Sequence, residues 1–288
     1  MKRIQHIVAL LLLLQTSGTA QTVQVKAPRF VRPLVERWAT EYGKTHTDFN
    51  VRFVQGKEVS DLTLVLSEEE GGVNFGRYAI VPFTARESEA ASILADKGLN
   101  NKRIKNVFFE NDEESKNKEE KAENKLHIYT GCSSLTTSRP YATSYGYAPA
   151  DYRGKRISGD DQILTQVISQ DPLGLGIGTL SNLFDIETGE ADKRVQIATL
   201  DADKKSLLQS ANTLVEAIEA IENHSIEGVG IEKVGFSYDE DDTQLSRFVL
   251  WILTDGQQYL HEYGLLTLSQ KELTAQQSRI RVQNIAQK

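Results

Sequence analysis

Apolar and polar positions alternate in two rhythms along the first third of the chain. Around Val23 and Val25, apolar residues fall at every second position, which is typical of a strand with one buried face. From Val31 to Tyr42 they recur every three or four residues, which predicts a helix that begins near the Pro28–Pro33 pair and ends at Gly43. This β-α-β order favours a parallel sheet covered by helices. The strands predicted here span residues 22–26, 50–54, 62–66 and 78–83.

Similar patterns continue in the second part of the chain. Strands are predicted over residues 126–129 and 174–178. The second strand reads GLGIG, but it lacks the following helix and the downstream acidic residue that a dinucleotide-binding fingerprint requires. Between them, Asp160 and Asp161 are placed to cap a helix that buries Ile163, Leu164, Val167 and Ile168. Further helices are predicted over residues 87–94, 206–221 and 243–263, the last preceded by an acidic run at 239–242 that suits a helix N-terminus.

The first twenty residues have the organisation of a secretory signal peptide. Lys2 and Arg3 precede an apolar run, Ile7 to Leu14, that is too short to cross a bilayer, and small residues lead to a cleavage site after Ala20. We therefore expect a protein that is exported to the periplasm and is not inserted in the membrane.

Charge and residue content argue against several classes of partner and site. The formal net charge is −7, which does not favour binding to nucleic acid or to an anionic membrane surface. Cys132 is the only cysteine, so an intramolecular disulfide and a cysteine-rich metal site are excluded, and we expect its side chain to be buried. The histidines show no metal-ligand spacing, and no nucleophile has a recognisable base partner. We expect no metal, no cofactor and no enzyme activity.

Residues 110–125 form a strongly charged segment. Eleven of these sixteen residues are charged, with both signs mixed. An electrostatic docking arm is one interpretation. The mixed signs and the lack of apolar residues favour the other, a solvated surface loop that the fold does not need.

The segment TGCSSLTTSRPYATSYG (130–146) is the strongest candidate for a functional site. It gathers hydroxyl side chains where a predicted strand gives way to a helix. Such side chains cap helices by accepting hydrogen bonds from the first backbone N–H groups. Together with those N–H groups and the helix dipole they also bind oxyanions, and α/β sheets place ligands at turns of this kind. The residues alone leave both interpretations open.

Four stretches taken together point to one family. They are the hydroxyl-rich segment, APRFVRPLVERWATEY (27–42), ISGDDQILTQVISQDPLGLGIGTLSNLFD (157–185) and RFVLWILTDGQQYLHEYGLLTL (247–268). In order and spacing they resemble the extracytoplasmic solute-binding proteins of phosphate ABC transporters. The resemblance implies an α/β fold of the type 2 periplasmic-binding-protein kind, with mixed, mostly parallel sheets in two lobes joined by a hinge. It implies lobe I at residues 21–84 and 230–288, lobe II at 85–229, and crossing segments near 80–88 and 222–238.

The resemblance also implies an anion site between the lobes. From lobe II, the residues that match the family's phosphate-contacting segment are Ser134, Leu135 (through its N–H), Thr136 and Thr137. From lobe I, they are Arg29 and the N–H of Phe30.

The chain departs from the family pattern in its charged and acidic positions. Thr130 and Cys132 stand where the family has an Arg and an Asp, and Val65-Leu66 stand where it has a Ser-Asp pair. Because a bound dianion needs a cation, Arg29, which replaces a Thr, is the candidate to supply one from the opposite lobe. The alternative is an ordinary solvent-facing arginine in the first turn of a helix.

These observations give two functional hypotheses. The first is a non-enzymatic, monomeric solute-binding protein that closes two lobes around a small oxyanion, with phosphate as the default, and delivers it to a membrane permease. The second is a ligand-free module of the same fold that serves interaction or signalling at the cell envelope, which the departures from the family pattern favour.

Overall fold

The computed structural model describes six stretches of the chain: residues 21–66, 72–95, 98–110, 122–132, 136–200 and 205–280. The predicted signal peptide, residues 111–121 of the charged segment, and the candidate residues Ser134 and Leu135 lie outside them. Within the described stretches, no helix is both long enough and apolar enough to cross a membrane.

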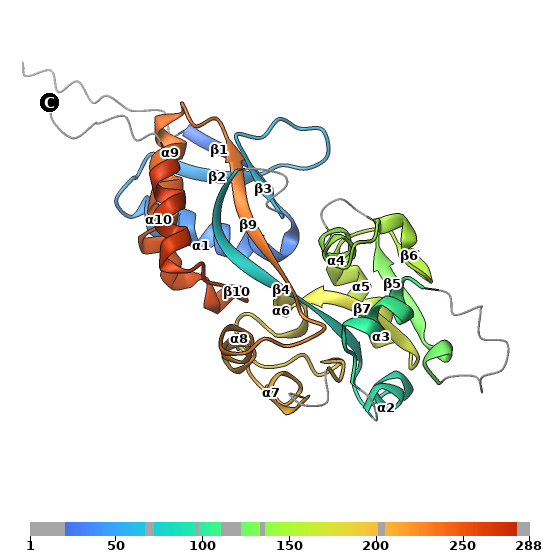
Figure 1. Ribbon diagram of the computed structural model, residues 1–288. Helices are drawn as coiled ribbons and strands as arrows, with labels where there is room; N and C mark the ends of the chain where they lie inside the picture. The colour runs from blue at the N-terminus through green and yellow to red at the C-terminus, as the bar shows by residue number, and fades with distance from the viewer. Residues whose placement is uncertain are drawn as a thin grey trace, which may run out of the picture.

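Three short parallel strands form the sheet of the first lobe, in the order β2 (Phe49–Phe53), β1 (Gln21–Lys26) and β3 (Leu62–Val65). The helices beside it are η1 (Arg29–Val31), α1 (Arg32–Gly43), α9 (Thr243–Ile252) and α10 (Gln270–Arg279). The α1 side chains Trp38 and Tyr42 are buried, and Trp38 donates its ring N–H to the carbonyl of Gly256 at 2.8 Å. This lobe therefore combines the first and the last described elements, β1 and α10 (Figure 1).

Three parallel strands also form the sheet of the second lobe, in the order β7 (Gly174–Thr179), β5 (His127–Gly131) and β6 (Lys155–Ile157). The helices of this part are α2 (Glu89–Ala95), α3 (Asn101–Phe108), η3 (Ala122–Lys125), α4 (Ser138–Ser144), η4 (Pro149–Asp151), α5 (Asp161–Ser169) and α6 (Leu180–Leu183). Three further elements follow them in the chain: β8 (Val195–Ile197), α7 (Lys205–Gln209) and α8 (Leu214–Asn223).

The long strand β4 (Val73–Ala85) links the two lobes. Its first part pairs antiparallel with β9 (Gly230–Tyr238) and β10 (Leu265–Leu266), and its last part pairs antiparallel with β7 and β8. Hydrogen bonds consequently run through one series of strands, β2-β1-β3-β9-β4-β7-β5-β6. Figure 1 shows β4 leaving one lobe and entering the other. The predicted two-lobed α/β architecture is confirmed; the residue boundaries of the lobes stay a prediction.

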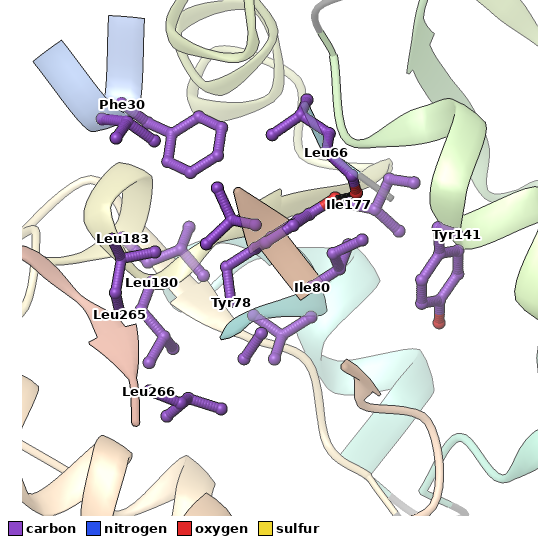
Figure 2. Close-up of a cluster of buried hydrophobic side chains, with 14 of the residues drawn as sticks. Phe30, Leu66, Tyr78, Ile80, Tyr141, Ile177, Leu180, Leu183, Leu265 and Leu266 are labelled. Atoms are coloured by element: carbon purple, nitrogen blue, oxygen red, sulfur yellow. Dashed lines mark hydrogen bonds between the residues drawn. The ribbon is translucent and has the colours of Figure 1, made fainter. Parts of the chain in front are cut away.

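The core is continuous across this junction. Tyr78 of β4 is fully buried, donates its hydroxyl to the carbonyl of Leu66 at 2.8 Å, and lies with its ring centre 5.6 Å from that of Phe30. Figure 2 shows Ile80 and Ile177 on one side of Tyr78, and Leu180, Leu183, Leu265 and Leu266 on the other. These side chains come from both lobes, so the junction is part of one hydrophobic core.

Two helices predicted from apolar spacing are each broken. The helix expected over residues 206–221 is two helices, because Thr213 and Glu216 form a capping box that begins α8. The helix expected over residues 243–263 ends at Ile252 and gives way to two 3-10 helices, η5 (Asp255–Tyr259) and η6 (His261–Tyr263). The sequence is polar at both breaks (QSANT at 209–213 and TDGQQ at 254–258), so the prediction extends the apolar spacing on either side across signals that end a helix.

Two predicted burials are also wrong. Cys132 is exposed, because it follows β5 at the point where the chain leaves the sheet. Ile163 is 42% exposed, because the buried face of α5 is carried by Leu164 and Ile168 instead.

Candidate functional site

Two strand-to-helix turns, one from each lobe, are joined by Arg29. This residue begins η1 and extends its side chain to the first residues of α5. Its Nε lies 3.0 Å from Oδ2 of Asp160, and its Nη1 donates to Oε1 of Gln162 at 2.6 Å. The Arg29 side chain remains 63% exposed. It is therefore both a solvent-facing first-turn arginine and a contact with the opposite lobe.

The Arg29–Asp160 ion pair separates two cavities, which we call the acidic hollow and the basic hollow. The acidic hollow has a volume of about 290 Å³, and its charged lining residues are Arg29, Asp160, Asp161, Asp185, Asp192 and Arg194. The basic hollow has a volume of about 360 Å³, and its charged lining residues are Lys26, Arg29, Arg32 and Asp160. One side of the Arg29–Asp160 pair is therefore lined mostly by carboxylates and the other side mostly by cations.

Most acids of the acidic hollow have local partners. Asp192 forms a two-point contact with Arg194, at 2.7 and 3.1 Å, and this guanidinium lowers the pKa of the carboxyl. Asp185 accepts hydrogen bonds from the backbone N–H groups of Glu187 and Thr188, which lower its pKa. No group of three or more His, Cys, Asp or Glu in the described stretches is arranged to hold a metal ion.

Asp161 differs from these acids because it is buried. Its side chain is only 5% exposed, and Oδ2 accepts a hydrogen bond from the N–H of Thr137 at 3.1 Å. Its other oxygen, Oδ1, has no hydrogen-bond partner among the described residues. Burial raises the pKa of Asp161 to about 7, against the opposing effect of the Thr137 N–H. An unpaired buried carboxylate oxygen favours a ligand or solvent group that donates to it.

The described part of the hydroxyl-rich segment does not act as a simple helix cap. Thr137 is the N-cap residue of α4, but its side chain makes no capping hydrogen bond. Its buried hydroxyl forms no hydrogen bond of standard geometry within the described stretches, but it lies beside the Asp161 carboxyl, and a side-chain hydrogen bond between the two lowers the pKa of that carboxyl. Ser138 accepts the N–H of Gly131 at 2.8 Å. The Ser138 hydroxyl therefore fixes the β5–α4 turn rather than capping the helix.

The remaining candidates from the sequence are placed as follows. Thr136 is buried in the same turn. The ring of Phe30 is in the core, so only its backbone N–H is suited to a ligand. One hydrogen bond, from Thr137 to Asp161, links the β5–α4 turn to the α5 start that Arg29 contacts.

Two solved structures share this arrangement of lobes. A protein assigned as a phosphate ABC transporter substrate-binding protein, from Clostridium perfringens with phosphate bound, gives a TM-score of 0.61 at 14% identity, over 86% of this chain and 100% of that one. An ABC-type phosphate transport receptor from Vibrio cholerae gives 0.54 at 13% identity, also over 86% and 100%. This chain has the two-lobed substrate-binding-protein fold. No protein-family model matches the sequence, and no curated protein is detectably similar to it.

Within the substrate-binding-protein fold, sequence reasoning missed three residues of the cleft. Lys26 and Arg32 line the basic hollow, and Asp161 lines the acidic one. A signal for the first two was present, because Lys26, Arg29 and Arg32 follow one another at three-residue spacing through the turn before α1. Asp161 was recognised only as part of a helix cap, a role that Asp160 performs by accepting the N–H of Ile163.

Proposed function

We propose that this protein is an exported solute-binding protein that closes its two lobes around a small oxyanion, with phosphate as the default, and delivers it to a membrane permease. The observation that carries the proposal is the reach of Arg29 from the start of α1 to the start of α5, beside both hollows. A cation that crosses the cleft can bind an anion and hold the lobes together at once. The fold shared with phosphate transport proteins supports this role.

In the bound state, the anion would receive bonds from both lobes. Ser134, Thr136 and Thr137 would contribute hydroxyls, and Leu135 and Phe30 would contribute backbone N–H groups. Arg29 would contribute the charge. Because its guanidinium now contacts Asp160, the anion must compete with that carboxylate for it.

The same ion pair favours a second candidate function. Arg29 is already neutralised by Asp160, and the acidic hollow is lined by more carboxylates than cations. A site of this charge opposes a dianion unless protonation or movement changes it. The second candidate is therefore a ligand-free interaction or signalling module at the cell envelope.

Isothermal titration calorimetry of residues 21–288 against phosphate and sulfate distinguishes the two candidates. A solute-binding protein gives saturable heat with at least one oxyanion, and Arg29→Ala reduces it. The envelope module gives no saturable heat with either anion.

Export is tested by sequencing the amino terminus of protein recovered from a secreting host. If the signal peptide is cleaved after Ala20, the first residue is Gln21.

A further inference from the structure

The start of α1 carries positive charge that its own helix does not explain. The first turn holds no acidic residue, its N-cap Val31 makes no side-chain cap, and Arg29 and Arg32 lie at this end. Cations at a helix N-terminus oppose the helix dipole and destabilise the helix slightly. Positive charge in this position therefore requires an explanation outside the helix.

Arg29 is paired with Asp160, but the partners of Arg32 and of the neighbouring Lys26 do not supply that explanation. Lys26 donates to the carbonyl of Gly56 at 3.2 Å; Arg32 donates to the carbonyl of Ala27 at 3.0 Å and lies over the ring of Phe53. Both side chains are half-buried, and neither has a carboxylate partner in the described stretches. Two partly desolvated, unneutralised cations face the basic hollow, whose only acidic lining residue is Asp160. This is the electrostatic environment of an anion-binding site at a helix N-terminus.

The acidic hollow, on the other side of Arg29, requires the opposite kind of group. Asp161 lines it and has a buried oxygen that forms no hydrogen bond of standard geometry in the described stretches, with the Thr137 hydroxyl as its polar neighbour. An N–H or O–H group is the complement of such an oxygen. One molecule that occupies both hollows must therefore carry an anionic group at one end and a hydrogen-bond donor at the other.

The volumes also favour a molecule larger than a bare tetrahedral oxyanion. The hollows measure about 360 and 290 Å³. A liquid water takes about 30 Å³, so each hollow has room for about ten waters, whereas a tetrahedral oxyanion has only five heavy atoms and fills only part of either hollow. Together the hollows fall within the usual range for small organic ligands.

We propose that the solute is a phosphate monoester whose organic part carries an amino or hydroxyl group. Lys26, Arg29 and Arg32 hold the phosphate in the basic hollow, and Asp161 accepts a hydrogen bond from the organic part in the acidic hollow. Arg29 lies between the two groups. This inference rests on the proposed solute-binding function and names the substrate class of the same cleft. It moves the anionic group from the hydroxyls of the β5–α4 turn to the basic hollow, since Thr136 and Thr137 are not among the lining residues of either hollow.

Calorimetry at pH 8 with three probes tests the inference: inorganic phosphate, ethyl phosphate and O-phosphoethanolamine. The last two differ mainly in the amino group. We expect O-phosphoethanolamine to bind about tenfold more tightly than ethyl phosphate, since a charge-assisted bond to a buried carboxylate is gained. We expect inorganic phosphate to bind more weakly than O-phosphoethanolamine.

Two variants assign the ends of the ligand. Lys26→Gln is expected to weaken both esters by a similar factor, whereas Lys44→Gln, at the far exposed end of α1, leaves them unchanged. Asp161→Asn is expected to remove the preference for O-phosphoethanolamine over ethyl phosphate without weakening ethyl phosphate. If Asp161→Asn does not fold, the three wild-type affinities and Lys26→Gln still decide.

The outcomes separate this inference from the function on which it rests. Inorganic phosphate that binds as tightly as either ester, with no effect of Lys26→Gln, overturns the ester assignment and leaves oxyanion binding intact. Equal binding of the two esters to the wild type overturns the role of Asp161. The absence of binding by all three probes overturns both the solute-binding function and the ester assignment.

Discussion

Helices α1 and α5 begin opposite each other across the cleft, and their first residues carry opposite charges. At the start of α5, Asp160 accepts the N–H of Ile163, and Asp161 lies in the first turn. Acidic residues at this end stabilise a helix through capping and through its dipole. At the start of α1 the charges come from Arg29 and Arg32, and no side chain caps the helix.

This difference in charge between the two helix starts separates residues that stabilise the fold from residues that the fold does not require. The position of Asp160 is explained by its own helix even if the cleft binds nothing. The cations at the start of α1 are opposed by their helix, and the proposed ligand of the cleft would supply their reason. Asp161 belongs to the second class despite its place in a helix start, because its burial destabilises the charged carboxylate.

The largest expected effect concerns Asp161 and pH. Its pKa rises from an ordinary 3.8 in the unfolded chain to about 7 in the folded protein. Between these values only the folded state holds the proton, so stability is lost as pH rises from about 4 to about 7. The loss is on the order of a few kcal/mol. Thermal melts of the wild type and Asp161→Asn across this range should diverge towards high pH, with the variant the more stable. Parallel pH profiles would show that Asp161 titrates normally.

The next effect tests the cation of the α1 turn. Arg29→Ala should weaken oxyanion binding about tenfold or more, on the order of 1.5–3 kcal/mol, because a charge-assisted bond is lost. Ser134→Ala and Thr136→Ala should each weaken it less. The melting temperature without ligand should hardly change, since the Arg29 side chain is mostly exposed. Calorimetry on the three variants makes the comparison. Binding that survives Arg29→Ala at full strength would remove Arg29 from the site.

A smaller effect of opposite sign is expected at the start of α5. Asp160→Asn releases Arg29 from its carboxylate and retains a good helix cap. Oxyanion affinity should therefore rise, by roughly three- to tenfold. Asp185→Asn is the matched control, because Asp185 lines the same hollow and is held by backbone N–H groups. An equal gain in both variants would indicate a general effect of charge rather than competition for Arg29.

The first strands and the first helix could be predicted to within a few residues, because period-two and period-3.6 patterns arise directly from burial on a sheet and on a helix. The breaks near Thr213 and Asp255 were missed although the sequence carries signals for them, a Thr213–Glu216 capping box and an Asp255-Gly256 turn, because apolar spacing on both sides was given more weight. The exposure of Cys132 depends on where β5 ends in the sheet, which composition does not encode.

For the cleft, sequence reasoning identified the turn of Arg29 but not its contacts. The ion pair with Asp160 joins residues more than a hundred positions apart. Only the approach of the two lobes brings these residues together. The burial of Asp161 arises within the second lobe, because it depends on the β5–α4 turn, more than twenty positions earlier in the chain, that bonds to it. The contribution of Ser134 and Leu135 stays a prediction.

The long strand β4 has a consequence for how the protein denatures. Its first residues bond to β9 and β10, and its last residues bond to β7 and β8. Both lobes therefore need β4, and unfolding of either lobe removes hydrogen-bond partners and buried contacts from this strand. Neither lobe retains a complete sheet alone. Heat or denaturant should therefore melt the two lobes in a single cooperative transition, and a proteolytic cut within residues 73–85 should release no folded half.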